Sequence, residues 1–275
     1  MALNLACESI GSGPPLLMMH GLFGSSGNWR GIARQLAASH AVHSLDLRNH
    51  GASPWADSMD YVEMADDVLQ LIDRLSLDRP TVMGHSMGGK TAMALALRHP
   101  ERVGRLIVVD IAPVSYADTL TPFAEAMRSA DVISAASRAE VMGRLQQNVP
   151  DRGIALFLMQ NLVTHNDHFD WRLNLAGIST AMPQLSAFPT ELLGLHFSGP
   201  VTVIAGENSD YVRQRDGAAF RPMFTDVAVE VIKDAGHWVH ADQPAAFLAA
   251  VGRALRDHVV PAQPVKARHL EGKRP

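Results

Sequence analysis

The chain has 275 residues, 47% of them hydrophobic and 19% charged, which suffices for one large domain or one domain that carries an insertion. Its formal net charge of −4 argues against a nucleic-acid-binding protein, because such proteins need a basic surface. The single cysteine, Cys7, excludes a disulfide within the chain and fits a reducing compartment.

The N-terminal residues show no basic stretch followed by a long apolar one, so no secretion signal is expected. No apolar run approaches the roughly 18 residues of a transmembrane helix, so no membrane span is expected either. We therefore expect a cytoplasmic protein that is a monomer or a homodimer.

Short apolar runs alternate with longer segments of helical periodicity along most of the chain. The runs that predict strands lie at 15–21, 41–47, 79–84, 105–110, 200–207 and 227–233. The segments that predict helices lie at 26–39, 64–75, 87–100 and 243–258. This alternation predicts an α/β fold with a mostly parallel central sheet flanked by helices on both faces.

The alternation stops between about residues 113 and 197, where the sequence is helical in character, contains prolines and shows no clear strand. We interpret residues 114–197 as a helical cap inserted above the carboxyl edge of the sheet. Residues 1–113 and 198–260 then form the catalytic domain. The final residues, 261–275, contain prolines and basic side chains and are expected to form a flexible tail.

One short stretch, VMGHSMGGKT at 82–91, matches two different catalytic motifs. Residues 84–88 are G-x-S-x-G, the turn that presents a nucleophilic serine, here Ser86. Residues 84–91 are also G-x-x-x-x-G-K-T, a loop that binds nucleotide phosphates. In addition, LIVVD at 106–110 resembles the magnesium-binding strand of P-loop NTPases. The stretch alone therefore allows a hydrolase or an NTPase.

The surrounding sequence favours the hydrolase. His20 and Gly21 end the first predicted strand, where a hydrolase needs a loop that donates a backbone N–H to its oxyanion hole. A phosphate loop usually follows the first strand of its sheet, whereas Ser86 follows the third predicted strand. A serine, an aspartate and then His237 also occur in an order in which serine hydrolases carry their catalytic residues.

Five segments together resemble a known family: HGLFGSSGNW (20–29), DLRNHGASP (46–54), GHSMGGK (84–90), VVDIAPVSY (108–116) and AGHWVHADQP (235–244). They are similar to the α/β-hydrolase superfamily and, within it, to the YbfF-type esterases. The resemblance covers about 15–116 and 200–258 and extends faintly to WRLNL at 171–175. It implies the α/β-hydrolase fold and an esterase or thioesterase for small or acyl-chain esters, with neither a metal ion nor an organic cofactor.

The candidate catalytic residues follow from these motifs. Ser86 is expected to be the nucleophile and His237 the base, while His240 is the nearest rival and is expected to face elsewhere. The acid stays open on the residues alone, because Asp110 and Asp210 each follow a strand whose end can reach the imidazole. The position of Asp210 is the more frequent one in this fold, but the YbfF-type resemblance points to Asp110.

The oxyanion hole is expected to consist of the backbone N–H groups of Leu22 and Met87, since Met87 opens a helix and its N–H is free. The residues expected in the substrate pocket are Phe23, His85, Phe123 and Trp238.

Two further groups of polar residues have structural interpretations. Lys90 and Thr91 are expected in the first turn of an ordinary helix, with the lysine in solvent and the threonine as a cap. Asp46, Arg48 and His50 are expected to form a network that braces the oxyanion loop.

We expect a serine hydrolase that cleaves carboxylic esters, or acyl thioesters, through an acyl-enzyme. THNDH at 164–168 places a carboxylate between two histidines, but a metal site would need a further strong ligand and a fixed geometry, so no metal is expected. Two alternatives remain open at this stage, namely a P-loop NTPase and a non-catalytic binding protein with the same fold.

Overall fold

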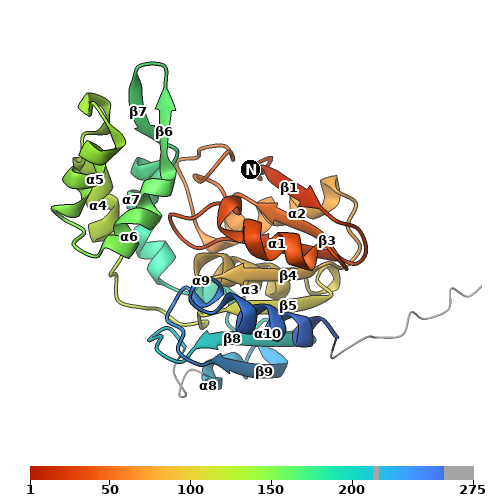
Figure 1. The fold of residues 1–275 in the computed structure, drawn as a ribbon. Helices are drawn as coiled ribbons and strands as arrows, with labels where there is room; N and C mark the ends of the chain where they lie inside the picture. Colours follow the sequence, from red (N-terminus) through yellow and green to blue (C-terminus); the bar gives the residue numbers. More distant parts are fainter. Residues whose placement is uncertain (213–216, 257–275) are drawn as a thin grey trace, which may run out of the picture.

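The computed structural model describes residues 1–212 and 217–256 and has a seven-stranded sheet at its centre (Figure 1). The strand order is β1-β3-β2-β4-β5-β8-β9, and in this sheet β1 pairs antiparallel while the other neighbours pair parallel. The strands of this sheet are β1 (Cys7–Ile10), β2 (Pro15–Met19), β3 (Ala41–Leu45), β4 (Thr81–His85), β5 (Arg105–Val109), β8 (Phe197–Gly206) and β9 (Phe224–Ile232). The predicted α/β fold is confirmed, although the short edge strand β1 was not predicted.

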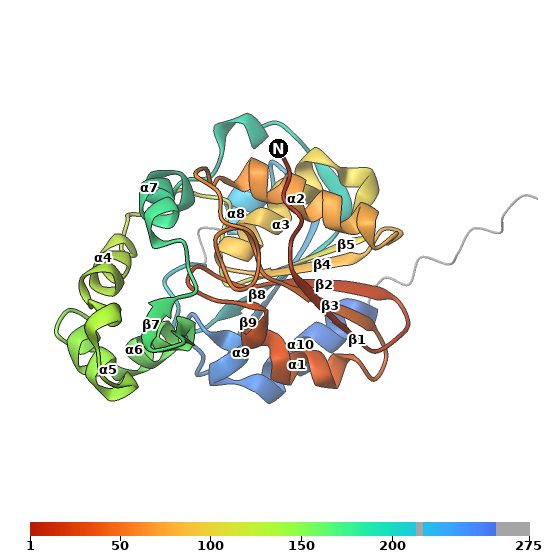
Figure 2. The same ribbon diagram turned by 90° about the horizontal axis from the view of Figure 1, so that it is seen from above.

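Helices cover both faces of the sheet, as Figure 2 shows from above. One face carries α2 (Tyr61–Arg74) and α3 (Met87–Arg98), and the other carries α1 (Arg30–Leu36) and α10 (Pro244–Arg256). Two short helices, α8 (Gly217–Phe220) and α9 (Val239–Asp242), follow β8 and β9. The predicted helix at 26–39 is divided into a 3-10 turn and α1, which ends at Leu36.

The sequence of α2 explains where this helix begins and which face it buries. The carboxylate of Asp60 accepts a hydrogen bond from the Glu63 N–H (2.8 Å), and such a bond stabilises a helix N-terminus. The buried apolar residues of α2 recur at helical spacing and are Tyr61, Met64, Ala65, Val68, Leu71 and Ile72. The 3-10 turns of the structure are Ser26–Trp29, Pro100–Arg102, Val132–Ser134, Met159–Asn161 and Thr190–Leu192.

The order of the strands creates a crevice at the carboxyl ends of β2 and β4. The chain passes from β2 to its neighbour β3 and then returns to β4, on the other side of β2. The loops after β2 and β4 therefore leave the sheet toward opposite sides, and parallel sheets bind ligands at such a switch point. Ser86 and the segment His20–Leu22 follow these two strands directly.

The segment between β5 and β8, residues 114–196, is called the insertion below and lies beside one end of the sheet (Figure 1). It contains α4 (Thr121–Ser129), α5 (Arg138–Gln146), α6 (Arg152–Leu158), β6 (Leu162–His165), β7 (His168–Trp171) and α7 (Leu175–Ser186). The prediction that this segment holds no strand is wrong, because β6 and β7 form an antiparallel hairpin. Each of its strands has four residues, too few for a clear alternating pattern, and the turn is exposed.

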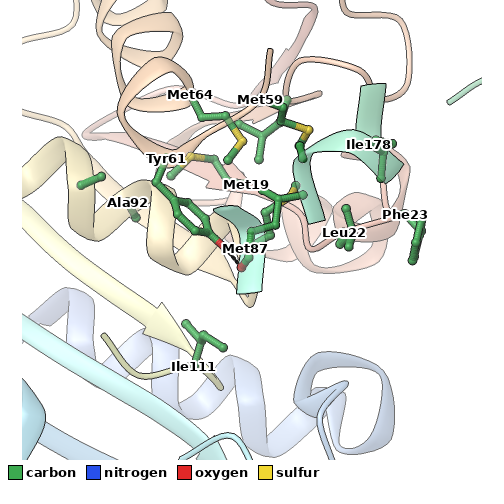
Figure 3. Close-up of a cluster of buried hydrophobic side chains, with 14 of the residues drawn as sticks. Met19, Leu22, Phe23, Met59, Tyr61, Met64, Met87, Ala92, Ile111 and Ile178 are labelled. Atoms are coloured by element: carbon green, nitrogen blue, oxygen red, sulfur yellow. Dashed lines mark hydrogen bonds between the residues drawn. The ribbon is translucent and has the colours of Figure 1, made fainter. Parts of the chain in front are cut away.

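Apolar side chains fill two clusters, one on each face of the sheet. The larger cluster continues from α2 and α3 into the insertion. Figure 3 shows Tyr61 of α2, Met87 of α3 and Ile178 of α7 in this cluster, close to Leu22 and Phe23 of the loop after β2. The insertion is thus packed directly against the helix that begins after Ser86. The predicted tail, 261–275, and residues 257–260 of the predicted catalytic domain lie outside the described residues.

Candidate active site

Ser86 occupies a sharp turn between the last residue of β4 and the first residue of α3. Its backbone angles, φ 53° and ψ −117°, are strained for a residue with a side chain. The turn needs the two glycines of the motif, because a Cβ on Gly84 would overlap the Gly88 carbonyl oxygen. A Cβ on Gly88 would lie 2.6 Å from the His20 carbonyl oxygen. The G-x-S-x-G pattern is therefore explained by close contact between β4, α3 and the loop after β2.

A hydrogen bond joins His237, in the loop after β9, to Asp110, directly after β5. His237 Nδ1–H donates to Asp110 Oδ2 (2.7 Å). The Asp110 carboxylate is fully buried and also accepts hydrogen bonds from the Gly206 N–H (2.9 Å) and the Ser209 hydroxyl. Asp210, the other candidate acid, has an exposed side chain. Because Nδ1 holds its proton against Asp110, Nε2 of His237 is left to accept one.

Two further side chains hold His237, one at its ring and one at its backbone. The ring of Tyr211 stacks on it, with ring centroids 4.1 Å apart. His85 Nε2–H donates to the His237 backbone carbonyl (2.8 Å), and burial lowers the pKa of His85 well below its ordinary value, so this ring is neutral. His85 thus supports the loop of His237 in addition to lining the cavity described below.

Ser86 and His237 line the same cavity. Among the described residues, no hydrogen bond from the Ser86 hydroxyl is found. Catalytic hydrogen bonds are often long without substrate and shorten when substrate binds. We therefore expect the hydrogen bond between the Ser86 hydroxyl and His237 to form in the complex with substrate.

Two backbone N–H groups are available beside Ser86. Within the described ranges, neither Leu22 N–H nor Met87 N–H donates to another backbone or side-chain group. Met87 is the first residue of α3, where the helix leaves its N–H groups free and adds positive potential. These are the two donors that the sequence analysis expected in the oxyanion hole.

The loop that carries Leu22 is held by two buried, neutral histidines. His20 Nδ1–H donates to the Gly21 carbonyl (2.8 Å), and His20 Nε2 accepts from the Leu47 N–H (3.0 Å). His50 Nε2 accepts from the Phe23 N–H (3.2 Å). Burial lowers the pKa of both rings, that of His50 to about 3. His20 was predicted only as the end of a strand, and its role in holding this loop was not predicted.

The loop after β3 is a hydrogen-bonded network, as predicted. Asp46 accepts from the Ser26 N–H (2.6 Å) and the Ala52 N–H (2.8 Å). Arg48 pairs with the buried Asp67 through two hydrogen bonds of 2.7 and 2.9 Å. Since His50 in the same loop holds Phe23, the network supports the oxyanion loop.

The cavity above Ser86 has a volume of about 300 Å³ and mostly apolar walls. All four residues predicted for the pocket, Phe23, His85, Phe123 and Trp238, are among its lining residues. The insertion contributes the side chains of Leu120, Phe123, Ile154, Phe157 and Leu158. One wall of the cavity therefore comes from the insertion and the other from the sheet domain.

His240 also lines this cavity, so the prediction that it faces elsewhere is wrong. The short helix α9 starts at Val239 and turns the ring of His240 back toward the site. Its centroid lies 4.5 Å from that of Trp29 and 5.0 Å from that of His85. Burial lowers its pKa to about 4, so this imidazole is neutral.

Lys90 and Thr91 also differ from their predictions. Lys90 is buried, with 1% of its surface exposed, and donates hydrogen bonds to the carbonyls of Ser186 and Ala187. The Thr91 hydroxyl is buried and donates to the Met87 carbonyl (3.0 Å) one turn earlier, so it is no cap. The P-loop alternative does not fit this arrangement, because it needs a lysine that reaches the phosphates of a nucleotide.

Residues 1–212 and 217–256 contain neither a metal-binding cluster nor a membrane-spanning helix. In this part of the chain no group of three or more His, Cys, Asp or Glu side chains is arranged to hold a metal ion. No helix in these ranges has both the length and the apolar character needed to cross a bilayer.

Comparison with known proteins gives the family. The profile of the alpha/beta hydrolase fold matches residues 14–144. The chain is 40% identical to the sn-1-specific diacylglycerol lipase ABHD11 of Xenopus laevis over 247 residues. This alignment covers 87% of this chain and 78% of the lipase. It is 34% identical over 247 residues to the esterase YbfF of Escherichia coli, covering 88% of this chain and 93% of the esterase.

Among solved structures, a marine microorganism esterase matches with a TM-score of 0.88 and 34% identity, over 92% of this chain and 99% of the esterase. The chain therefore belongs to the α/β-hydrolase family and is related within it to the YbfF-type esterases, as the five motifs predicted. The predicted enzyme class, a carboxylic ester hydrolase, is confirmed at this level.

Proposed function

We propose that this enzyme cleaves carboxylic esters through an acyl-enzyme formed on Ser86, with His237 as the base and Asp110 as the acid. The observation that carries the proposal is the 2.7 Å hydrogen bond from His237 to the buried Asp110, with His237 and Ser86 facing one cavity at the switch point of the sheet.

Each residue has a defined part in this mechanism. His237 Nε2 removes the proton of Ser86, and Oγ attacks the ester carbonyl carbon. The carbonyl oxygen becomes an oxyanion that the N–H groups of Leu22 and Met87 stabilise. His237 then returns the proton to the departing alcohol. Water, activated by the same imidazole, hydrolyses the acyl-enzyme and frees Ser86.

The cavity supports an ester with an apolar acyl chain of moderate length. A volume of about 300 Å³ is at the lower end for small-molecule sites, and its walls are mainly aromatic and aliphatic. The diacylglycerol of the Xenopus laevis relative carries two acyl chains, which are more than this volume encloses. We therefore propose a single acyl chain in the cavity and the alcohol part toward solvent. An acyl thioester presents the same carbonyl and is the second candidate substrate.

We propose that the insertion acts as a cap on the catalytic domain, because its side chains form one wall of the cavity. A cytoplasmic location is supported by the single free cysteine, Cys7, and is tested by fractionation of cells that express the full chain. Light scattering on the purified protein decides between a monomer and a homodimer.

A chain-length series tests the proposed function. Purified protein is assayed with p-nitrophenyl esters from acetate to palmitate, with the matching acyl-CoA thioesters, and with ATP and Mg²⁺. We expect a maximum kcat/KM at intermediate chain length and no activity in the Ser86→Ala variant. Phosphate release from ATP that survives Ser86→Ala would instead support an NTPase. A folded wild type without any ester or thioester turnover would support a non-catalytic binding protein.

A further inference from the structure

Lys90 lies at the place where the insertion joins the sheet domain. Its backbone N–H donates to the Ser86 carbonyl (3.1 Å), so it lies one turn after the serine on α3. Its Nζ donates to the carbonyl of Ala187 (2.7 Å) and to that of Ser186 (3.2 Å), at the C-terminal end of α7. A cation is stabilised at this end of a helix, where the carbonyls lack partners within the helix.

The other end of the insertion meets the same ammonium group. Nζ lies 4.9 Å from the ring centroid of Tyr116, just after β5, and 5.4 Å from that of Tyr61 on α2. Aromatic faces at such distances attract a cation. The two ends are also joined to each other, because the Tyr116 N–H donates to the Ser186 carbonyl (2.9 Å). The first and last segments of the insertion thus converge on one side chain of the nucleophile helix.

Within residues 1–212 and 217–256, Lys90 forms no salt bridge with a carboxylate. Among the described residues, the small cavity that Lys90 lines with Ser86 and Met87 has no acidic side chain in its walls. Burial lowers the pKa of Lys90 to about 7. A buried lysine costs stability, so packing alone gives no reason for a lysine here rather than a methionine. Its hydrogen bonds to the insertion are the contacts that methionine cannot supply.

We propose that Lys90 is a positioning residue that clamps both ends of the insertion onto α3 and thereby fixes the wall of the acyl cavity above Ser86. This inference rests on the proposed function for its kinetic consequence, but the clamp itself is a structural claim. It also gives a role to the lysine that made the sequence resemble a phosphate loop.

The test compares Lys90→Met with wild type and with Lys233→Met, which removes an exposed lysine after β9. At pH 6, where Lys90 is protonated, we expect amide hydrogen exchange at 114–117 and 186–188 in Lys90→Met to rise about tenfold or more, as for a lost charge-assisted hydrogen bond. KM for p-nitrophenyl octanoate should rise several-fold, while labelling of Ser86 by a small fluorophosphonate stays within about threefold. Lys233→Met should change none of these quantities.

Two results would overturn the clamp. One is wild-type exchange at both ends of the insertion in folded Lys90→Met. The other is a fall in the rate of fluorophosphonate labelling as large as the fall in kcat/KM for p-nitrophenyl octanoate, since Lys90 would then act on Ser86 itself. If Lys90→Met does not fold, Lys90→Gln, which keeps one amide donor, is measured by the same criteria. If wild type shows no Ser86-dependent turnover, the proposed function fails, whereas the exchange comparison still tests the clamp.

Discussion

Replacing Asp110 by asparagine separates the two carboxylates that the sequence offered as the catalytic acid. One carboxylate oxygen of Asp110 accepts from the Gly206 N–H, and the other accepts from His237 Nδ1–H and the Ser209 hydroxyl. An asparagine keeps one acceptor oxygen. The backbone N–H of Gly206 is fixed and needs an acceptor, so the asparagine oxygen should face Gly206. The new NH₂ group then faces His237.

This orientation changes the tautomer of His237. Nδ1 must then accept a hydrogen bond from the asparagine, and the ring proton moves to Nε2, on the side of Ser86. The imidazole no longer accepts the serine proton. The equivalent change in a serine protease lowers kcat about 10⁴-fold. At about 1.4 kcal/mol per tenfold in rate, this is a loss of about 5 kcal/mol of transition-state stabilisation.

The assay is kcat and KM with p-nitrophenyl butyrate, with the thermal midpoint as a check of folding. Asp110→Asn should lower kcat by about four orders of magnitude and leave KM within a few-fold. Asp210→Asn, at the exposed alternative position, should retain nearly full activity. If Asp210→Asn loses activity and Asp110→Asn keeps it, both the assignment of the acid and the tautomer argument are wrong.

Three further predictions concern packing, pH and the cavity. Gly88→Ala places a methyl group 2.6 Å from the His20 carbonyl oxygen and should lower the free energy of unfolding in urea by about 1–3 kcal/mol. Gly143→Ala, whose methyl group would meet no atom outside its own helix within 4 Å, should not lower it. Equal effects of the two substitutions would contradict the packing argument. Lys90 has a pKa of about 7 in the folded chain against 10.5 as its ordinary value, so between these values the unfolded chain binds the extra proton. The unfolding free energy of wild type relative to Lys90→Met should therefore rise from pH 7 to pH 10; a difference independent of pH would contradict the burial of a titrating lysine. Phe157→Ala opens a wall of the cavity beside Trp238. It should raise KM for the octanoate ester several-fold and leave KM for the acetate ester unchanged. Equal changes in KM for both esters would contradict the proposed acyl site.

Much of the fold could be predicted because its signals are local. The apolar runs gave the inner strands to within a few residues, and β4 and the turn at Ser86 follow from the glycine spacing. The edge strand β1 was missed because three of its four residues are exposed. The hairpin β6–β7 was missed because its strands are short and partly polar.

The parts that could not be predicted depend on partners far away in the chain. Lysine is almost never fully buried, so a solvated Lys90 was the reasonable expectation. Its partners, the carbonyls of Ser186 and Ala187, lie almost 100 residues later and leave no trace in side-chain chemistry. The approach of Asp110 to His237 likewise depends on how β5 and the loop after β9 meet.

Whether Ser86 is a nucleophile that His237 activates is tested by peptide mass spectrometry after treatment with a fluorophosphonate. We expect one adduct per chain, on the peptide that contains Ser86, and much slower labelling in His237→Ala because the base is missing. Folded protein that takes up no label, or ester hydrolysis that persists in Ser86→Ala, would contradict this role of Ser86.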